Sequence, residues 1–233
     1  MRVLSNGIYY NPASTENHKL ILDGVREIIG KYDIDGIHID DYYYPTTEAS
    51  FDKAQYDAYR NAGGTLSLSK WRISNVNGFV LSLYSTVKTA DSSLIVSISP
   101  SGQIDKTLNE AYADCRHWLS QKGYADIIIP QIYFGFNHQT EGFSKLLNQW
   151  ASLPRHSSVK LVCGIAAYKC AKSDAYAGAG KNEWTQSTDI LARQTKAIRS
   201  NKNYSGVAVF SYSDLNRSAC KTEIENMKKE FTS

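Results

Sequence analysis

Short apolar segments alternate five times with longer amphipathic segments, and this alternation constrains the fold of the chain more than any other feature. Short segments that are apolar throughout are typical of strands covered on both faces, as in a parallel sheet. They are residues 34–39, 94–99, 126–133, 160–168 and 206–212. The segments with helical apolar spacing are residues 18–30, 69–89, 108–121, 143–152, 188–200 and 219–231. The pattern predicts an α/β fold with helices around a parallel sheet.

The number of strand–helix units is smaller than a closed barrel requires. A TIM barrel has eight such units, whereas this chain supplies about five, because residues 7–17 predict a loop and no further strand. Residues 45–68, 134–142 and 169–187 predict long loops at the carboxyl ends of strands. We expect residues 1–233 to form a single, partial barrel domain with its amino-terminal strands missing. Self-association or that missing segment would then cover the open strand edges.

Composition excludes several classes of function. The net charge is only +3 and the basic residues are scattered, so no nucleic-acid-binding stripe is expected. No apolar run is long enough to span a membrane, and the first residues do not form a signal peptide. The four cysteines form no close pair of the zinc-binding kind; free thiols are expected, with a pairing such as Cys163–Cys170 left open. No metal or other cofactor is expected, since neither a metal-ligand spacing nor a phosphate-binding loop occurs.

The segment at residues 32–45 carries the strongest functional signal. Its strand ends in two adjacent carboxylates, Asp40 and Asp41, which are followed by three tyrosines and a proline. The carboxyl ends of strands form the active-site face of α/β barrels. Strand alternation places His38 and Asp40 on one face, directed into the barrel. We therefore predict that Asp40 and Asp41 are catalytic, the alternatives being a structural role for Asp40 and a loop-capping role for Asp41.

Other strand ends supply groups that could hold a sugar. Sugar rings have apolar faces that stack on aromatic side chains, and 12% of the residues are aromatic, although tyrosine also fills protein cores. Three candidates have a structural alternative: His38 as a hydrogen-bonded core residue, Gln131 as filling of the barrel interior, and Trp184 as packing of its own loop. The predicted substrate-binding residues are His38, Tyr42, Gln131, Tyr133, Tyr168, Trp184 and Tyr212.

Several motifs occur in the order found in one known family. They are Asn11-Pro12, Asp35 to Pro45, Trp71-Arg72, Asn75-Val76, Ser97 to Gly102, Asp114, Trp118, and Pro130 to Tyr133. From about Asn11 to Tyr212 the chain resembles the glycosyl-hydrolase-like family ten proteins. The resemblance implies a barrel whose fourth strand ends at Asp40, so that the strands of this chain are the fourth to the eighth. In that family Asp40 matches the most regular acidic position, Asp41, Gln131 and Tyr133 match rim motifs, and Trp71 and Arg72 match a structural motif.

The resemblance also implies an activity and a location. It implies hydrolysis of glycosidic bonds in a bacterial polysaccharide, and one family member acts on peptidoglycan glycan strands stripped of peptides. Most members are exported, so an extracytoplasmic location is expected. The strand is also distantly similar to that of family eighteen chitinases, but Tyr42 stands where those enzymes have the proton-donating glutamate. This difference argues against substrate-assisted cleavage.

The sequence supports two hypotheses about the function of the chain. The first is a glycosidase with a pair of carboxylates, the partner of Asp40 being Asp41, a residue on a missing strand, or one of the loop residues Asp105, Glu141, Glu183 and Asp214. The second is a non-catalytic carbohydrate-binding barrel or an inactive truncated remnant. A phosphate-binding barrel enzyme ranks below both, because no glycine-rich turn joins a strand to a helix.

Overall fold

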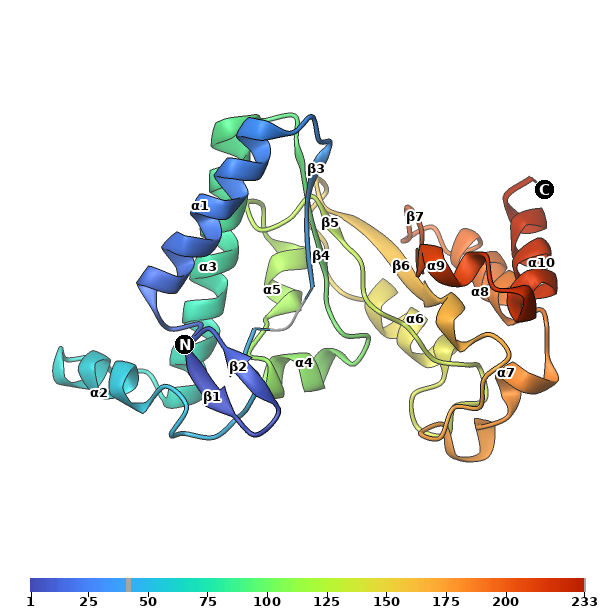
Figure 1. Ribbon diagram of the computed structural model, residues 1–233, viewed down its shortest axis with the longest axis horizontal. Helices are drawn as coiled ribbons and strands as arrows, with labels where there is room; N and C mark the ends of the chain where they lie inside the picture. Colours follow the sequence, from blue (N-terminus) through green and yellow to red (C-terminus); the bar gives the residue numbers. More distant parts are fainter. Residues whose placement is uncertain (41–42, 233) are drawn as a thin grey trace. The chain divides into compact units, whose positions relative to one another are not determined.

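The computed structural model describes residues 1–40 and 43–232, which group into two compact units (Figure 1). The first unit consists of Met1–Pro100 and Ile104–Asp126, and the second of Ser101–Gln103 and Ile127–Ser233. Asp41 and Tyr42, both predicted site residues, lie outside the described residues.

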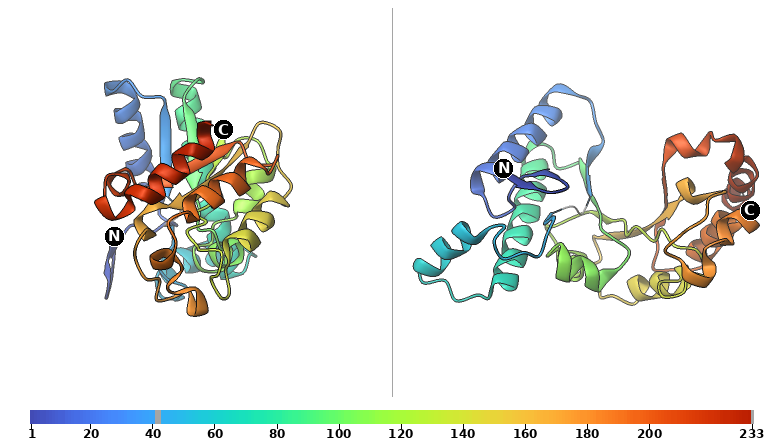
Figure 2. Two further views of the ribbon diagram at one scale, coloured as in Figure 1. Left: turned by 90° about the vertical axis from the view of Figure 1, so that its right-hand side faces the viewer. Right: turned by 60° about the horizontal axis from the view of Figure 1, so that its bottom comes forward.

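The first unit contains a hairpin, two βα units and additional helices. Its elements are β1 (Arg2–Leu4), β2 (Gly7–Tyr9), α1 (Thr15–Lys31), β3 (Gly36–Asp40), α2 (Lys53–Asn61), α3 (Leu68–Ala90), β4 (Ile95–Ser99), α4 (Ile104–Glu110) and α5 (Cys115–Ser120). Helices α1 and α3 lie side by side (Figures 1 and 2). Both begin at a serine, Ser14 and Ser67, whose hydroxyl accepts a hydrogen bond from a backbone N–H of the first turn.

The second unit holds the remaining strands. Its strands and α-helices are β5 (Ile127–Ile128), α6 (Phe143–Ala151), β6 (Lys160–Ala166), α7 (Glu183–Gln186), α8 (Ile190–Arg199), β7 (Gly206–Phe210), α9 (Tyr212–Leu215) and α10 (Lys221–Thr232). Short 3₁₀ turns occupy η1 (Ala167–Lys169), η2 (Gly178–Gly180) and η3 (Ser218–Cys220). Helix α10 packs against α8, and the core between helices and strands includes Trp150, Leu191 and Ile165.

Five parallel strands form one sheet in the order β3-β4-β5-β6-β7, which is also their order in the chain. In the first unit Gly36 pairs with Ile95, and in the second Val162 pairs with Gly206. Gly36 allows the close approach of β3 and β4, because a Cβ there would lie 2.2 Å from the carbonyl oxygen of Ile95. Sequential parallel strands joined through helices confirm the predicted α/β fold with about five βα units.

Some predicted element boundaries are wrong. The helix expected at residues 108–121 is broken into α4 and α5, and Tyr112 between them has a φ of 57°. Residues 45–68, expected to be a loop, contain α2. The strand expected at 126–133 is reduced to Ile127–Ile128, and Pro130 beyond it has no N–H to donate to a neighbouring strand.

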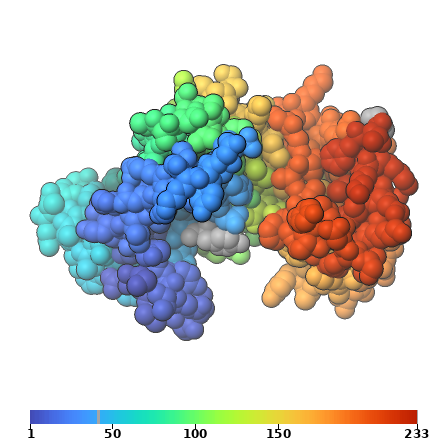
Figure 3. Space-filling model, turned by 45° about the horizontal axis from the view of Figure 1, so that its top comes forward, coloured from blue at the N-terminus to red at the C-terminus, as the bar shows by residue number. Residues whose placement is uncertain are grey.

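The amino-terminal hairpin was also not expected. Its strands are joined by Ser5 and Asn6, because Leu4 pairs directly with Gly7. The hairpin and α1 lie at the surface of the first unit (Figure 3). Val3 and Ile8 are largely exposed, so the hairpin contributes little to the core of this unit.

The described residues offer neither a membrane-spanning helix nor a cluster of metal ligands. No helix within residues 1–40 and 43–232 is long and apolar enough to cross a membrane. Over the same residues no group of three or more histidine, cysteine or acidic side chains could hold a metal ion. The four cysteines are buried free thiols, so the pairing of Cys163 with Cys170 left open above is not formed.

The carboxyl group of Glu223 on α10 makes the stability of the second unit pH-dependent. Burial raises its pKa from 4.5 to about 7, although the N–H of Leu191 donates a hydrogen bond to Oε1. A raised pKa means that the folded state binds an extra proton, so the stabilisation is complete below pH 4.5 and is lost as the pH rises through 7.

Glu223→Gln should therefore flatten the fall in melting temperature between pH 4.5 and pH 7. At pH 8 the variant should melt higher than wild type by about 2–4 °C, the shift that about 1 kcal/mol produces in a chain of this size. Thermal unfolding followed by circular dichroism measures this, with the exposed Glu225→Gln on the same helix as the control. An unchanged pH slope in Glu223→Gln would contradict the assignment.

Candidate functional site

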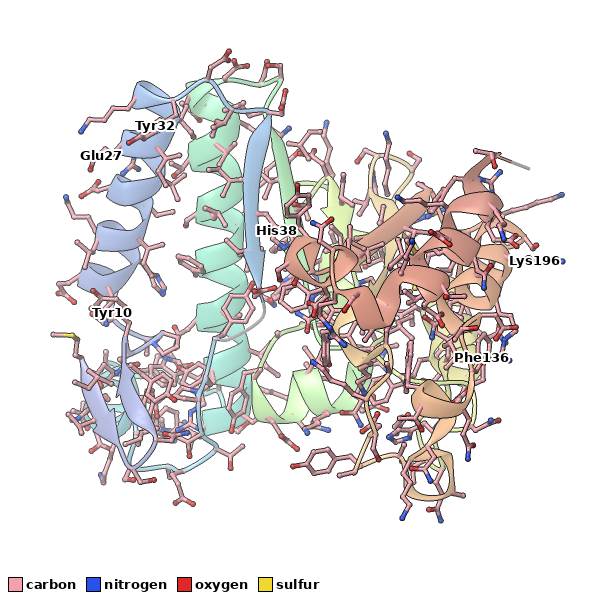
Figure 4. The ribbon with its side chains drawn as sticks, turned by 45° about the vertical axis from the view of Figure 1, so that its right-hand side comes forward. Tyr10, Glu27, Tyr32, His38, Phe136 and Lys196 are labelled. Atoms are coloured by element: carbon pink, nitrogen blue, oxygen red, sulfur yellow. The ribbon has the colours of Figure 1, made fainter. Side chains whose placement is uncertain are left out.

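His38 and Asp40 lie together at the carboxyl end of β3. The register pairs His38 with Ser97 and Asp40 with Ser99, so the four side chains share one face of the two strands. His38 Nδ1 is 2.8 Å from the Ser97 hydroxyl, and its Nε2 is 3.9 Å from Asp40 Oδ1. Figure 4 shows His38 beside β3. The predicted orientation of these two residues on a common face is thus seen in the first unit.

The side chains of His38 and Asp40 are half exposed, at 50% and 51%. His38 is therefore not a buried core residue, which was its structural alternative, and Asp40 is accessible at this strand end. A half-exposed carboxylate does not require a buried ionic partner and remains open to an incoming ligand.

A cavity of about 330 Å³ adjoins Asp40 within the first unit. It lies between β2, the start of α1, the middle of α3 and the end of β3. Its size falls within the range of small-molecule sites, about 300–1,000 Å³. The residues that line it are Ile8, Tyr9, Tyr10, Asn11, Pro12, Asn17, His18, Ile21, Ile39, Asp40, Tyr43, Val76 and Phe79.

A buried ion pair fixes the loop that follows β3. The side chains of Arg72 and Asp52 have no exposed area, and two guanidinium nitrogens of Arg72 donate to the two oxygens of Asp52 at 2.9 and 2.6 Å. Arg72 also donates to the carbonyl oxygens of Thr47 and Glu48 and to the Tyr112 hydroxyl. All five N–H groups of the guanidinium are thereby used. Arg72 is thus structural, as its motif implied, and it holds the segment that leads away from the Asp40 strand end.

In the second unit, three aromatic rings gather at the carboxyl ends of the strands. The ring centroids of Tyr133 and Tyr168 are 5.9 Å apart, and the two rings meet edge to face. The ring centroids of Tyr133 and Phe210 are also 5.9 Å apart, and these two rings are nearly parallel. The ring centroids of Tyr168 and Phe210 are 6.1 Å apart. Phe210 is 55% exposed, so part of its ring is accessible. The structure brings together the predicted residues Tyr133 and Tyr168, and it adds Phe210, which the sequence analysis missed.

The second unit also holds the predicted residues Tyr212, Trp184 and Gln131. Tyr212 lies beyond the end of β7, in α9, and is 81% exposed. Trp184 is only 2% exposed, so its ring packs inside the unit and offers no face to a sugar, contrary to the predicted stacking role. The backbone of Gln131 forms isolated bridges to Ser101 and Gly164.

The loop carboxylates proposed as partners of Asp40 have mostly local roles. Glu183 is buried and accepts hydrogen bonds from the backbone N–H groups of Phe136 and Asn137, so it is a loop-fixing group. The Ser211 hydroxyl, together with Arg217, lowers the pKa of Asp214, which makes that carboxyl a poor proton donor. Glu141 pairs with Lys145, and Asp105, largely exposed in the first unit, pairs with Arg116.

Comparisons with known proteins agree on one family. The family model described as "Glycosyl hydrolase-like 10" matches residues 2–179. Glycosyl hydrolase YngK of Bacillus subtilis (strain 168) is 31% identical over 230 residues, which cover 91% of this chain and 43% of YngK. Glycosyl hydrolase DigH of Escherichia coli (strain K12) is 28% identical over 184 residues, covering 72% of this chain and 42% of DigH. The chain thus spans less than half the length of these relatives.

Among solved structures, the native xylanase 10B from Thermotoga maritima is similar with a TM-score of 0.51 and 10% sequence identity. The match covers 98% of this chain and 71% of the xylanase chain. Family 10 xylanases have a TIM-barrel fold, so the likeness confirms that the five βα units are of the TIM-barrel class. At this identity it shows the fold alone.

Proposed function

Because the chain belongs to the glycosyl hydrolase-like 10 family, we propose that it is a glycosidase that hydrolyses a bacterial polysaccharide, with peptidoglycan glycan strands as substrate. The observation that carries the proposal is the position of Asp40, half exposed at the end of β3 and on the wall of a cavity. This is the strand end at which TIM-barrel enzymes place their catalytic groups.

The proposed chemistry uses Asp40 as one of the two carboxyl groups that glycoside hydrolysis ordinarily requires. Asp40 serves either as the group that protonates the leaving oxygen or as the carboxylate that faces the sugar carbon. Asp41, which lies outside the described residues, is proposed as a second catalytic residue from its position in the motif. His38, with Nδ1 hydrogen-bonded to Ser97 and Nε2 3.9 Å from Asp40 Oδ1, is proposed to bind the substrate beside the Asp40 carboxyl.

The direct experiment is incubation of the chain with glycan strands stripped of their peptides. A glycosidase releases one new reducing end for each bond cleaved. We expect reducing ends to accumulate with time and with protein concentration. Binding to the strands without release of reducing ends would instead favour the alternative, a non-catalytic carbohydrate-binding barrel.

We propose that Tyr133, Tyr168 and Phe210 bind a sugar of the same polysaccharide. Phe210→Ala should raise KM about 5-fold with little change in kcat, which corresponds to loss of about 1 kcal/mol of stacking. Steady-state kinetics on defined glycan oligomers measures this. Tyr176→Ala is the control, since Tyr176 belongs to the same unit and is 91% exposed. Equal KM values for both variants and wild type would show that this cluster does not bind the substrate.

The proposed substrate also implies a location, because peptidoglycan lies outside the cytoplasmic membrane. We propose that the chain acts there, which fractionation of cells that produce the native protein would test.

Among the described residues β3 and β7 each pair on one side only, and we propose that another segment or copy covers these edges. A sedimentation-velocity measurement would detect association of copies.

A further inference from the structure

The cavity beside Asp40 contains a buried hydrogen-bond donor that has no partner. Asn11 is 4% exposed, and none of the described residues accepts a hydrogen bond from its Nδ2. A buried amide N–H without a partner is costly, because it has lost its hydrogen bonds to water and gained none in exchange. The donor is therefore a group that a ligand could satisfy.

The acceptors around this amide are already used. Asn11 Oδ1 accepts from the N–H of Ala13 at 2.9 Å, and the Asn11 carbonyl accepts from Ser14 N–H and from the Asn17 amide. The Pro12 carbonyl accepts from His18 Nε2 at 2.6 Å. Burial lowers the pKa of His18, so its imidazole stays neutral at pH 7. This end of the cavity thus presents Asn11 Nδ2 as a donor in need of an acceptor, and a carbonyl oxygen supplies one.

The walls next to these polar groups are apolar. Val76 is fully buried and Phe79 is 9% exposed, with the Phe79 ring 5.0 Å from that of His18. Ile21 and Ile39 also contribute to the apolar lining. A group that enters here has to combine an acceptor oxygen with a small apolar remainder. An acyl group has this combination.

We propose that the cavity is a subsite for a sugar ring that carries an N-acyl substituent. The acyl carbonyl oxygen accepts a hydrogen bond from Asn11 Nδ2, and the acyl methyl group packs against Val76 and Phe79. This inference rests on the proposed function, since it places an N-acylated sugar beside Asp40 in the same carbohydrate site. It goes further by naming the substituent that is recognised and the residue that recognises it.

Binding of monosaccharides tests the subsite without any bond cleavage. N-acetylglucosamine and glucose are titrated into the wild-type chain, and dissociation constants are measured by ligand-observed NMR. We expect N-acetylglucosamine to bind about tenfold more tightly than glucose, and Asn11→Ala to remove that difference, because a hydrogen bond of about 1.4 kcal/mol corresponds to tenfold. Asn203→Ala, an exposed asparagine of the second unit, should leave both constants unchanged.

A second variant guards against misfolding. Asn11→Asp keeps the Oδ1 acceptor for Ala13 but loses the donor, and at pH 8 it should also lose the preference for the acetylated sugar. Equal affinities for the two sugars in wild type, or an unchanged preference in both Asn11 variants, would overturn the proposal. The reducing-end assay separates the two hypotheses. Acetyl-dependent binding without hydrolysis supports the subsite and counts against the glycosidase, whereas hydrolysis with no role for Asn11 does the reverse.

Discussion

Replacing Arg72 with methionine is expected to lower the free energy of unfolding by about 3–5 kcal/mol, because the Asp52 carboxylate is then left buried without its partner. The loss is large for two further reasons. The guanidinium lies 5.0 Å from the ring centres of both Tyr44 and Tyr112, and it holds two loop carbonyl groups at Thr47 and Glu48. Urea unfolding followed by tryptophan fluorescence measures the change.

The chain offers a matched surface ion pair as control for Arg72→Met. Arg116 donates to Asp105 at 2.8 Å, with the two side chains 42% and 81% exposed. Exposed pairs of this kind contribute at most about 1 kcal/mol, so Arg116→Met should hardly change stability. If both substitutions lowered stability equally, the buried pair would not have the anchoring role described here.

Asp40→Asn is expected to reduce kcat on glycan strands by about 10²–10⁴-fold, the usual contribution of a catalytic acid or base. The substitution preserves shape and removes the ionisable group, and the side chain is half exposed, so the fold should be unaffected. KM should change little, because the change concerns proton transfer or charge stabilisation rather than sugar stacking. Initial rates of reducing-end release give both constants.

Asp35→Asn is the matched control for this prediction. Asp35 immediately precedes the same strand at its opposite end and is exposed, so the charge change is identical while the distance from the cavity is greater. The Asp35 variant should retain the wild-type rate. A similar loss of rate in both variants would mean that net charge, and not the position of Asp40, determines activity.

The sequence predicted the elements that have a simple apolar pattern. Strands β3, β4, β6 and β7 are short apolar runs, and α3 carries Val76, Val80 and Leu83 as a buried stripe. Such patterns are typical of strands and helices, so they predict both element type and fold class, although β3 and β7 contain no buried residue. Helix α2 was missed because its sequence is strongly polar and none of its residues is buried; its Tyr56 and Tyr59 pack on Trp71, a contact that the local sequence does not reveal.

The hairpin was missed although it has a local signal. Asn6, in the two-residue turn, and Gly7 directly after it are common turn residues, but the flanking strands have three residues each and their apolar side chains are largely exposed. Strands of this length give too little alternation to predict. The turn residues were thus the one available indication.

Within the candidate site, position along a strand was easier to predict than burial. The alternation of His38 and Asp40 placed both on one face correctly, but their exposure depends on neighbouring elements that the local pattern does not contain. Phe210 was missed because the strand was expected to continue to Tyr212, two residues beyond its actual end. Similarly, an Asp52–Arg72 pair separated by 20 residues gives no periodic signal, since charged residues are expected at the surface.

Chemical rescue tests most directly whether the Asp40 carboxyl takes part in the reaction. Asp40→Gly removes the side chain and leaves space for a small carboxylate such as formate. We expect this variant to be inactive on glycan strands in plain buffer, and added formate to restore a measurable rate of reducing-end release. Hydrolysis by Asp40→Gly at the wild-type rate without formate would contradict a catalytic role for the Asp40 carboxyl.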